Sequence, residues 1–413
     1  MKLSLGEIKR ILPIAKRRLA TKLVDWVQRL LSDEKLVKDV FGSGYRKRVL
    51  LCHLPEAFAA KELPKHHSNL TECRTAAECF HKLGYRVDCT SRANTAIDYT
   101  PYDIVFGING NAFFGSFQAT QGKEPLRIFY SVGAQMGYNF DVTAKRNASF
   151  HTRHGLWLLE SNRYVPGGGM NHYEARLSDA VICLGDSFVV EQFTADDPRP
   201  GHYRQLSAFY FPTIKPDEKK DFEKCRNNIL WFGSMGLIHK GLDIAIDFAI
   251  THREYTLHIC GSSSNEKDFW RYYSPKIKEV GNIIVHGFVD IESEKFERLL
   301  NGCALLLNPS ISEGGAVSVL NILGNGALMP IYSRGTGLDL ETVGTVVEEV
   351  TYDAFEEALM QAAAMPVEEL SAKAWAAHRL VQENYTLENY RNNLLGYIEE
   401  IIKKSDKYEK NRD

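Results

Sequence analysis

The sequence predicts an α/β protein built from two successive open units, each with a parallel sheet. Its 413 residues are enough for two domains of ordinary size. From residue 48 onward, short apolar runs alternate with helical stretches of ten or more residues. This alternation indicates parallel strands, because parallel strands need long crossover connections between them. Two open units fit the pattern better than one barrel, which the pattern alone does not exclude.

Composition places the chain among ordinary globular proteins and excludes several classes. Hydrophobic residues make up 44% and charged residues 25%, and the formal net charge is −2. These values exclude collagen-like, disordered and small disulfide-stapled chains. The nearly neutral balance also argues against bulk nucleic-acid binding, which would need a strongly basic face, so we expect no nucleic-acid partner.

The eight cysteines indicate neither a disulfide framework nor a zinc site. None forms a Cys-x-x-Cys pair. Four lie in apolar strand-like runs, where a thiol behaves as a small hydrophobic side chain: Cys52, Cys183, Cys260 and Cys303. This usage predicts a reducing compartment, so we expect a cytoplasmic protein.

Residues 1–45 are predicted to form a basic amphipathic helical segment. Apolar residues recur at helical intervals over residues 8–31, and residues 1–48 carry a local charge of +8 against −10 for the remainder. Such a helix can contact an anionic membrane surface, which would make the protein peripheral on the cytoplasmic membrane face. The alternative is that its apolar stripe packs on the body of the protein, since acidic residues dilute the basic face.

The first unit is predicted to span residues 46–215. Its expected strands are Arg48–His53, Arg86–Cys89, Ile104–Gly107, Leu126–Ser131, Ala180–Leu184 and Ala208–Phe211. A helix is expected from about Leu70 to Leu83, with Gly84 as its C-terminal cap. Residues 212–224 combine two prolines with a charged run, which is typical of a linker.

The second unit is predicted to span residues 216–385. Its expected strands are Asn228–Phe232, Leu257–Cys260, Ile283–Val285, Ala304–Leu307, Met329–Tyr332 and Thr345–Glu349. Helical stretches lie between these strands, and two more helices, Val367–Glu383 and Leu387–Lys404, are expected to close the chain.

Polar residues that follow the strands are candidate binding residues, because ligands of open α/β sheets bind beyond the carboxyl ends of the strands. One strand ends at Gly233 and Ser234, the backbone stays open through Gly236, and Lys240 comes just before an apolar helix. Free backbone N–H groups and one ammonium can cradle a phosphate. The alternative is an ordinary strand-to-helix turn with an exposed lysine.

A second candidate turn follows the strand expected at 304–307. Glu313 precedes Gly314 and Gly315, and an apolar helix follows. Glycines at the start of a helix let an anion approach the N–H groups, where the helix dipole favours negative charge. Glu313 can accept hydrogen bonds from the hydroxyl groups of a bound polyol, or it can be a simple charge at the start of the helix.

Two further strands end near glycines, at Gly261 and in the run from Gly287 to Val289. In an open α/β unit both strand ends would face the same cleft as the two turns above. A plain turn of small residues is the alternative explanation for each.

Together these segments resemble the donor-binding domain of the retaining glycosyltransferases known as group 1 or family 4. The matching pieces stand in that family's order and spacing over about residues 225–390: Gly-Ser-x5-Lys-Gly-Leu-Asp at 233–243, Cys-Gly-Ser at 260–262, His-Gly-Phe-Val at 286–289 and Pro-Ser-x-Ser-Glu-Gly-Gly at 309–315. The resemblance implies the GT-B fold, in which two Rossmann-like domains with parallel sheets face each other. It also implies that residues 386–413 form a helix that crosses back to the N-terminal domain.

The resemblance implies a role for each matched residue. Lys240 would neutralise the diphosphate of the donor, and Glu313, as the first glutamate of the family's Glu-x7-Glu motif, would hold hydroxyl groups of the donor sugar. These two are the implied catalytic residues. The implied donor-binding residues are Gly233, Ser234, Lys240, Gly261, Phe288, Val289, Glu313, Gly314, Gly315 and Asn321.

Two positions depart from the family's pattern. Asn321 stands where the family usually has its second glutamate, a ribose ligand, and asparagine lacks the charge. Ser234 stands where many members have an arginine that contacts phosphate. Because losing one charge-assisted bond costs about 1.5–3 kcal/mol, Lys240 and the helix dipole would carry more of the leaving-group stabilisation.

Acceptor-side candidates lie in the amino-terminal half, which matches the family only loosely. They are His67, Asn69, Asn109, Asn111 and Gln135. Family members often place a histidine near the reacting sugar, and Gln135 is the nearest equivalent here.

The resemblance implies an enzyme of the hexosyltransferase type. It would move a sugar from a nucleoside-diphosphate sugar to a saccharide, glycolipid or glycoprotein acceptor, with retention of the anomeric configuration, as in polysaccharide biosynthesis. No Asp-x-Asp occurs in the sequence, so we expect no obligatory metal or other cofactor. One alternative is a catalytically degenerate GT-B protein that binds a nucleotide sugar or scaffolds a partner transferase. Another is an epimerase acting on the sugar nucleotide itself.

Overall fold

The computed structural model describes residues 36–65, 68–118, 124–158, 160, 170–195, 197–261 and 264–410. The helix expected over residues 8–31 and the acceptor-side candidate His67 lie outside these described residues, so both stay predictions. Within the segment 1–45, Leu36–Val37 forms a short strand, β1, and not a helix.

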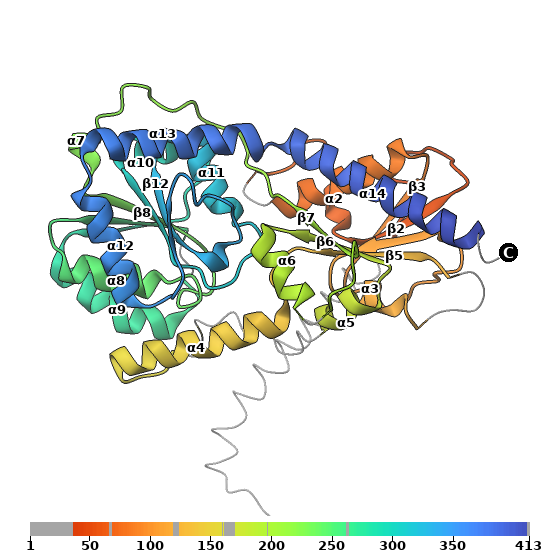
Figure 1. Ribbon diagram of the computed structural model, residues 1–413, viewed down its shortest axis with the longest axis horizontal. Helices are drawn as coiled ribbons and strands as arrows, with labels where there is room; N and C mark the ends of the chain where they lie inside the picture. Colours follow the sequence, from red (N-terminus) through yellow and green to blue (C-terminus); the bar gives the residue numbers. More distant parts are fainter. Residues whose placement is uncertain are drawn as a thin grey trace, which may run out of the picture. The chain divides into compact units, whose positions relative to one another are not determined.

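Seven strands form the first sheet, in the spatial order β1-β3-β2-β4-β5-β6-β7 (Figure 1). Strand β1 runs antiparallel to β3, whereas β2 is parallel to β3 and β4, and β6 is parallel to β7. The remaining strands are β2 (Arg48–His53), β3 (Arg86–Ser91), β4 (Ile104–Gly107), β5 (Leu126–Ser131), β6 (Ala180–Leu184) and β7 (Tyr203–Leu206). The helical segments are η1 (Pro55–Phe58), α2 (Ser68–Lys82), α3 (Asn111–Gly115), α4 (Met136–His154), α5 (Met170–Leu177) and α6 (Ser187–Thr194).

The strand expected over Ala208–Phe211 is wrong, and the last strand of this sheet is instead β7. The segment 208–211 is apolar and buried, which is why its pattern indicated a strand. Its backbone is paired differently, because Tyr210 N–H donates to the carbonyl oxygen of Tyr385 over 2.9 Å and Phe211 N–H donates to the side chain of Asn321 over 2.8 Å.

Six strands form the second sheet, in the order β10-β9-β8-β11-β12-β13, and every neighbouring pair is parallel. Counted along the chain this is the order 3-2-1-4-5-6 of a Rossmann fold, and it confirms the predicted parallel α/β unit. The strands are β8 (Asn228–Phe232), β9 (Thr256–Cys260), β10 (Ile283–Gly287), β11 (Leu305–Asn308), β12 (Met329–Ser333) and β13 (Thr345–Val347). The helical segments are α7 (Phe222–Cys225), α8 (Leu242–Thr251), α9 (Lys267–Val280), α10 (Glu294–Gly302), α11 (Val317–Asn325), η2 (Arg334–Thr336) and α12 (Tyr352–Ala364).

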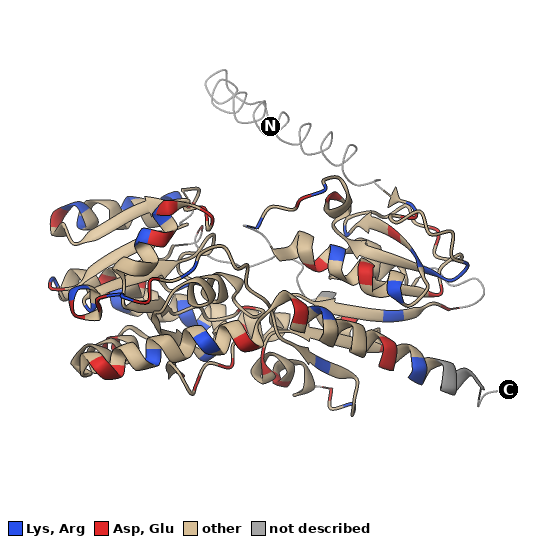
Figure 2. Ribbon diagram, turned by 90° about the horizontal axis from the view of Figure 1, so that it is seen from above, with Lys and Arg blue, Asp and Glu red and all other residues tan. Residues whose placement is uncertain are grey.

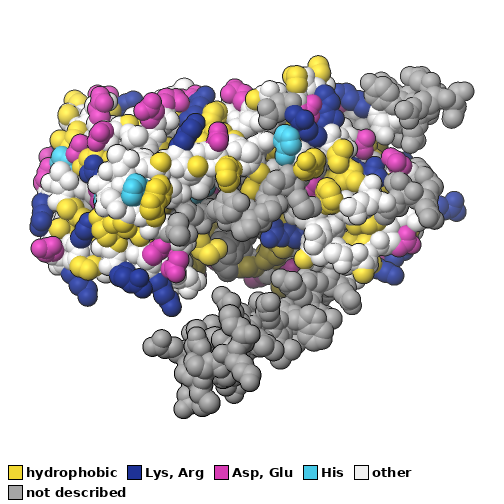
Figure 3. Space-filling model, turned by 90° about the horizontal axis from the view of Figure 1, so that it is seen from below, with side chains coloured by type: hydrophobic (Ala, Val, Ile, Leu, Met, Phe, Trp, Pro, Cys, Tyr) yellow, Lys and Arg dark blue, Asp and Glu magenta, His cyan; other side chains and the backbone are white. Residues whose placement is uncertain are grey.

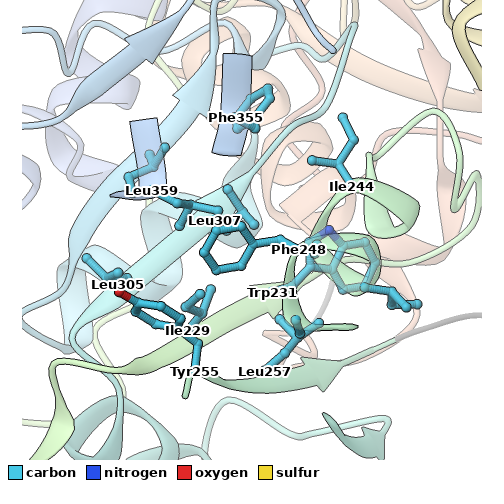
Figure 4. Close-up of a cluster of buried hydrophobic side chains, with 14 of the residues drawn as sticks. Ile229, Trp231, Ile244, Phe248, Tyr255, Leu257, Leu305, Leu307, Phe355 and Leu359 are labelled. Carbon is cyan, nitrogen blue, oxygen red and sulfur yellow. The ribbon is translucent and has the colours of Figure 1, made fainter. Parts of the chain in front are cut away.

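A buried apolar cluster holds the second sheet against its helices. Trp231 of β8, Phe248 of α8 and Leu307 of β11 are each at most 1% exposed and point toward one another, with Phe355 and Leu359 of α12 beside them (Figure 4). Burying a side chain of this size stabilises the fold by about 1.5–3 kcal/mol. This packing fixes the strand ends from which the polar turns emerge.

Two helices end the described chain, α13 (Val367–Asn384) and α14 (Leu387–Lys410). The hydroxyl of Tyr390 on α14 lies 3.0 Å from that of Tyr130 on β5, and Glu400 pairs with Arg204 of β7. The last helix therefore contacts strands of the first sheet.

The chain divides into two compact units. One takes the chain up to Leu63 together with Asn69–Ile128, and the other takes Pro64–Ser68 with Phe129 to the C-terminus. Every contact described below lies within the second unit unless stated. The domain boundaries expected near residues 46, 216 and 386 stay predictions.

Charged side chains of both signs are interspersed over the described surface. Neither Figure 2 nor Figure 3 shows an extended face of one sign among the described residues. None of the described helices is both long enough and apolar enough to cross a membrane.

Candidate functional site

The turns that follow β8 and β11 lie together where the order of the second sheet reverses. These strands are paired neighbours, and ligands of open α/β sheets bind at such a point. Ile311 N–H donates to the carbonyl of His239 over 3.1 Å, and a ring nitrogen of His239 donates to the carbonyl of Ser312 over 2.9 Å. A Cβ on Gly241 would lie 2.4 Å from the Cβ of Pro309, so this close approach of the two turns requires glycine.

Lys240 and Glu313 form an ion pair across the two turns. Lys240 Nζ lies 2.6 Å from Glu313 Oε1, and the hydroxyl of Ser310 donates to the same oxygen over 2.7 Å. The two charged side chains are 13% and 12% exposed. Glu313 is also fixed by its backbone, because its N–H donates to the carbonyl of Gly335 over 2.8 Å. A partly buried ammonium and carboxylate thus lie together, where they can meet an anion and hydroxyl groups in one place.

Gly314 and Gly315 lead from this ion pair into α11. A Cβ on Gly314 would lie 2.6 Å from the carbonyl oxygen of Val132, and Gly315 has φ +71°. Packing and backbone conformation therefore require glycine at both positions. The first N–H groups of α11 lack partners within the helix, so its N-terminal end favours an anion.

Two N–H groups of the Lys240 turn are already occupied. The carboxylate of Glu266 accepts hydrogen bonds from Gly236 N–H over 2.6 Å and from Leu237 N–H over 2.8 Å. Glu266 is 5% exposed and comes immediately before α9. The expectation that this turn offers free backbone N–H groups is therefore wrong for these two.

The predicted base-contacting residues differ in their exposure. Phe288 is 70% exposed, whereas the side chain of Val289 is 3% exposed. Gly261 N–H donates to the carbonyl of Gly287 over 2.7 Å, and a Cβ on Gly261 would lie 2.7 Å from the carbonyl oxygen of Gly233. Most of the Phe288 side chain is thus accessible to solvent, while the glycines let neighbouring strand ends approach closely.

Asn321 and Ser234, the two departures from the family's pattern, lie in contrasting environments. Asn321 is 7% exposed, and its amide oxygen accepts the hydrogen bond from Phe211 N–H. One turn along α11, the side chain of Asn325 accepts from Thr213 N–H over 2.7 Å. Asn321 therefore helps α11 hold the segment that follows β7. Ser234 is exposed at the end of β8.

The acceptor-side candidates are spread over several elements. Asn69 lies in α2, Asn109 follows β4, and Asn111 is the first residue of α3. Asn69 and Asn111 are exposed. All three belong to the first compact unit, and their role in acceptor binding stays a prediction.

Gln135 starts α4 and orders a histidine that the sequence did not single out. Its side-chain oxygen accepts from Tyr138 N–H over 2.7 Å, and its side-chain nitrogen lies 2.9 Å from Nδ1 of His172 on α5. Since the Tyr138 bond fixes the amide orientation, the amide nitrogen must donate to Nδ1. Neutral His172 therefore carries its proton on Nε2, as a donor.

Helix α4 also contacts the turn that carries Glu313. The hydroxyl of Tyr138 donates to the carbonyl of Ile311 over 3.4 Å, and the side-chain amide of Asn139 donates to the hydroxyl of Ser312 over 2.9 Å. Burial raises the pKa of Tyr138 to about 12. The phenol therefore stays protonated and acts as a donor at neutral pH.

The far end of α4 is anchored on α8 by buried charges. Arg146 pairs with Asp243, and both side chains are 3% exposed. Burial raises the pKa of the Asp243 carboxyl, and the Arg146 charge acts in the opposite direction. Asp247 accepts from Arg153 over 3.1 Å and lies 2.9 Å from Nε2 of His154. The aspartate that ends the Lys-Gly-Leu-Asp motif thus holds α4 in place. Two aspartates in an otherwise mainly apolar helix were the available signal.

No cluster of three or more metal-ligating side chains occurs in the part of the chain that the structure describes. Asp186 caps α6 by accepting from Val189 N–H over 3.1 Å, and burial raises its pKa to about 6.

Comparison with known proteins identifies the fold. No family model matches the chain, and no curated protein is significantly similar to it in sequence. Among solved structures, sucrose-phosphate synthase from Thermosynechococcus elongatus is similar with a TM-score of 0.62 and 12% identity, over 86% of this chain and 99% of that one. The Anabaena protein HepE, solved with UDP and glucose, has a TM-score of 0.56 and 11% identity, over 86% and 100% of the two chains. TarM has a TM-score of 0.51 and 15% identity, over 71% and 54%. The chain has the GT-B fold of these proteins, as the sequence predicts.

Proposed function

We propose that this protein is a glycosyltransferase that uses a nucleoside-diphosphate sugar as donor. The observation that carries the proposal is the Lys240–Glu313 pair, placed at the switch point of a Rossmann sheet beside the N-terminal end of α11. This arrangement combines a cation and a helix dipole for a diphosphate with a carboxylate for sugar hydroxyl groups.

Donor binding would exchange partners within this ion pair. The ammonium of Lys240 would turn from the Glu313 carboxylate to an oxygen of the diphosphate, and Glu313 would accept hydrogen bonds from the sugar. Ser310, which already donates to Glu313, can keep the carboxylate oriented during the exchange. The main contribution to catalysis would be electrostatic stabilisation of the departing diphosphate.

The donor would stack its base on Phe288, the exposed ring at the end of β10. The structures of HepE with UDP and with UDP-glucose make UDP-glucose the first donor to test. The same proposal includes four further points. The transferred group is a hexose, its anomeric configuration is retained, the acceptor is a saccharide, glycolipid or glycoprotein, and the reaction is independent of metal ions. A cytoplasmic location fits it too, since all eight cysteines are buried thiols.

A second candidate is a GT-B protein that binds a nucleotide sugar without turning it over. Asn321 favours it, because its amide oxygen is bonded to Phe211 N–H and the position lacks the carboxylate that the family resemblance implies for the ribose. The intact Lys240–Glu313 pair favours the transferase.

The test is a UDP-release assay with UDP-glucose, run with and without a panel of saccharide and lipid-linked acceptors. The proposal expects UDP release that depends on an acceptor and is lost in Lys240→Ala. Lys278→Ala is the matched control, since Lys278 is an exposed lysine on α9. UDP binding without release under any acceptor supports the second candidate. Epimerised sugar nucleotide without an acceptor contradicts both.

A further inference from the structure

Glu266 holds the turn that carries Lys240 by two charge-assisted hydrogen bonds. One carboxylate oxygen accepts from Gly236 N–H over 2.6 Å, and the other accepts from Leu237 N–H over 2.8 Å. Hydrogen bonds from backbone N–H groups to a carboxylate are stronger than neutral ones. With Glu266 only 5% exposed, water competes little for these bonds.

The carbonyl groups of the same two residues hold the backbone at and just after Lys240. Lys240 N–H donates to the carbonyl of Gly236 over 2.7 Å, and Leu242 N–H donates to the carbonyl of Leu237 over 2.9 Å. Gly236 itself has φ +85°, a conformation that favours glycine. Because glycine has a wide choice of backbone conformations, the orientation of the peptide planes on either side depends on their hydrogen bonds. The peptide that joins Gly236 to Leu237 carries both an N–H bound by Glu266 and the carbonyl that accepts from Lys240 N–H, so its rotation would move the Lys240 backbone.

We infer that Glu266 is a positioning residue that orders the Lys240 turn for binding a diphosphate. The inference rests on the proposed function, because it assigns Glu266 a part in the same donor site. Glu266 acts through the backbone of the turn, which sets the position of the Lys240 ammonium.

The opposite hypothesis is that Glu266 competes with the diphosphate for the N–H groups of Gly236 and Leu237. The burial of Glu266 argues against it. A diphosphate that took both N–H groups would leave a carboxylate buried without those partners, and burying an unpaired charge is costly. The two hypotheses predict effects of opposite sign when the carboxylate is removed.

The experiment compares wild type with Glu266→Gln by calorimetric titration against UDP, GDP and ADP. The glutamine keeps one oxygen acceptor but sets an NH2 group against the second backbone N–H. The inference expects the Kd of the nucleoside diphosphate that wild type binds to rise about tenfold, which corresponds to loss of one such bond. Asp221→Asn is the matched control, because Asp221 accepts from Lys224 N–H at the start of α7. It should leave the Kd unchanged.

Binding of the parent nucleoside separates positioning from a general loss of structure. A misplaced Lys240 weakens only ligands with a diphosphate, so NMR titration should give wild type and Glu266→Gln the same Kd for the nucleoside. Equal weakening of nucleoside and diphosphate overturns the inference, as does an unchanged or tighter diphosphate Kd. Wild type that binds none of the three nucleoside diphosphates overturns the proposed function, and the inference falls with it.

Discussion

Removal of the Lys240 ammonium should affect turnover more than it affects nucleotide binding. A charge-assisted contact to phosphate contributes about 1.5–3 kcal/mol, equivalent to about 10-fold to 150-fold in affinity. We expect the loss of affinity to lie at the low end of this range, because the ammonium must leave Glu313, 2.6 Å away, before it can meet the diphosphate. We therefore expect Lys240→Ala to raise the Kd of UDP about tenfold.

The effect on the rate of turnover is not reduced in this way by the contact with Glu313. As the bond to the sugar breaks, negative charge builds on the leaving diphosphate, and removing one donor to such a charge typically costs about 10²–10³ in rate. Release of UDP from UDP-glucose, measured with a coupled assay, should fall by that factor in Lys240→Ala and stay unchanged in Lys278→Ala. The reasoning is refuted if the melting temperature of Lys240→Ala matches wild type and both its Kd and its rate stay within twofold of wild type.

Three further predictions follow from the described contacts. Glu313→Gln should bind UDP more tightly than wild type, because no carboxylate then holds Lys240, yet sugar transfer should slow because the sugar loses a hydrogen-bond acceptor. Calorimetry measures the first effect and UDP release the second. Weaker UDP binding would contradict the exchange of partners within the ion pair. Arg146→Met should destabilise the fold by about 3–5 kcal/mol in chemical denaturation, because it leaves Asp243 buried without its cation. The double variant Arg146→Met with Asp243→Leu should recover much of this loss. If the two substitutions instead lower the free energy of unfolding additively, the pairing is contradicted. Burial lowers the pKa of His258 to about 4, below the value of about 6.5 for an unfolded chain. Between these pH values the unfolded state binds more protons than the folded state, so the free energy of unfolding should fall as the pH drops from 6.5 to 4. His258→Gln should flatten that part of the pH profile in thermal scans, and an unchanged slope would contradict the prediction.

Local sequence patterns predicted correctly that Lys240 and Glu313 lie in turns that follow strands, whereas their role in a site stays a prediction. Each of the two residues follows an apolar run and precedes an apolar helix, and the pairing of β8 with β11 brings their turns together. The run 208–211 shows the limit of the same reasoning. It is as apolar as a buried strand, but its backbone donors meet Tyr385 and Asn321, which are far away in sequence.

Residues that act through distant partners left little trace in the sequence. Glu266 resembles any acidic residue before a helix, and only the folded chain shows that its carboxylate binds Gly236 and Leu237. His172 acquires its tautomer from Gln135, 37 positions away. No local pattern encodes such pairings, because they depend on which strand ends the sheet order places side by side.

Phosphorus NMR of bound UDP tests the central claim most directly, since it reports on the diphosphate itself. The account predicts that wild type shifts the β-phosphorus resonance of UDP, that Lys240→Ala strongly reduces this shift at saturating nucleotide, and that Lys278→Ala leaves it unchanged. A β-phosphorus shift of the same size in saturated wild type and Lys240→Ala would contradict the account, because the diphosphate would then lie away from the ammonium.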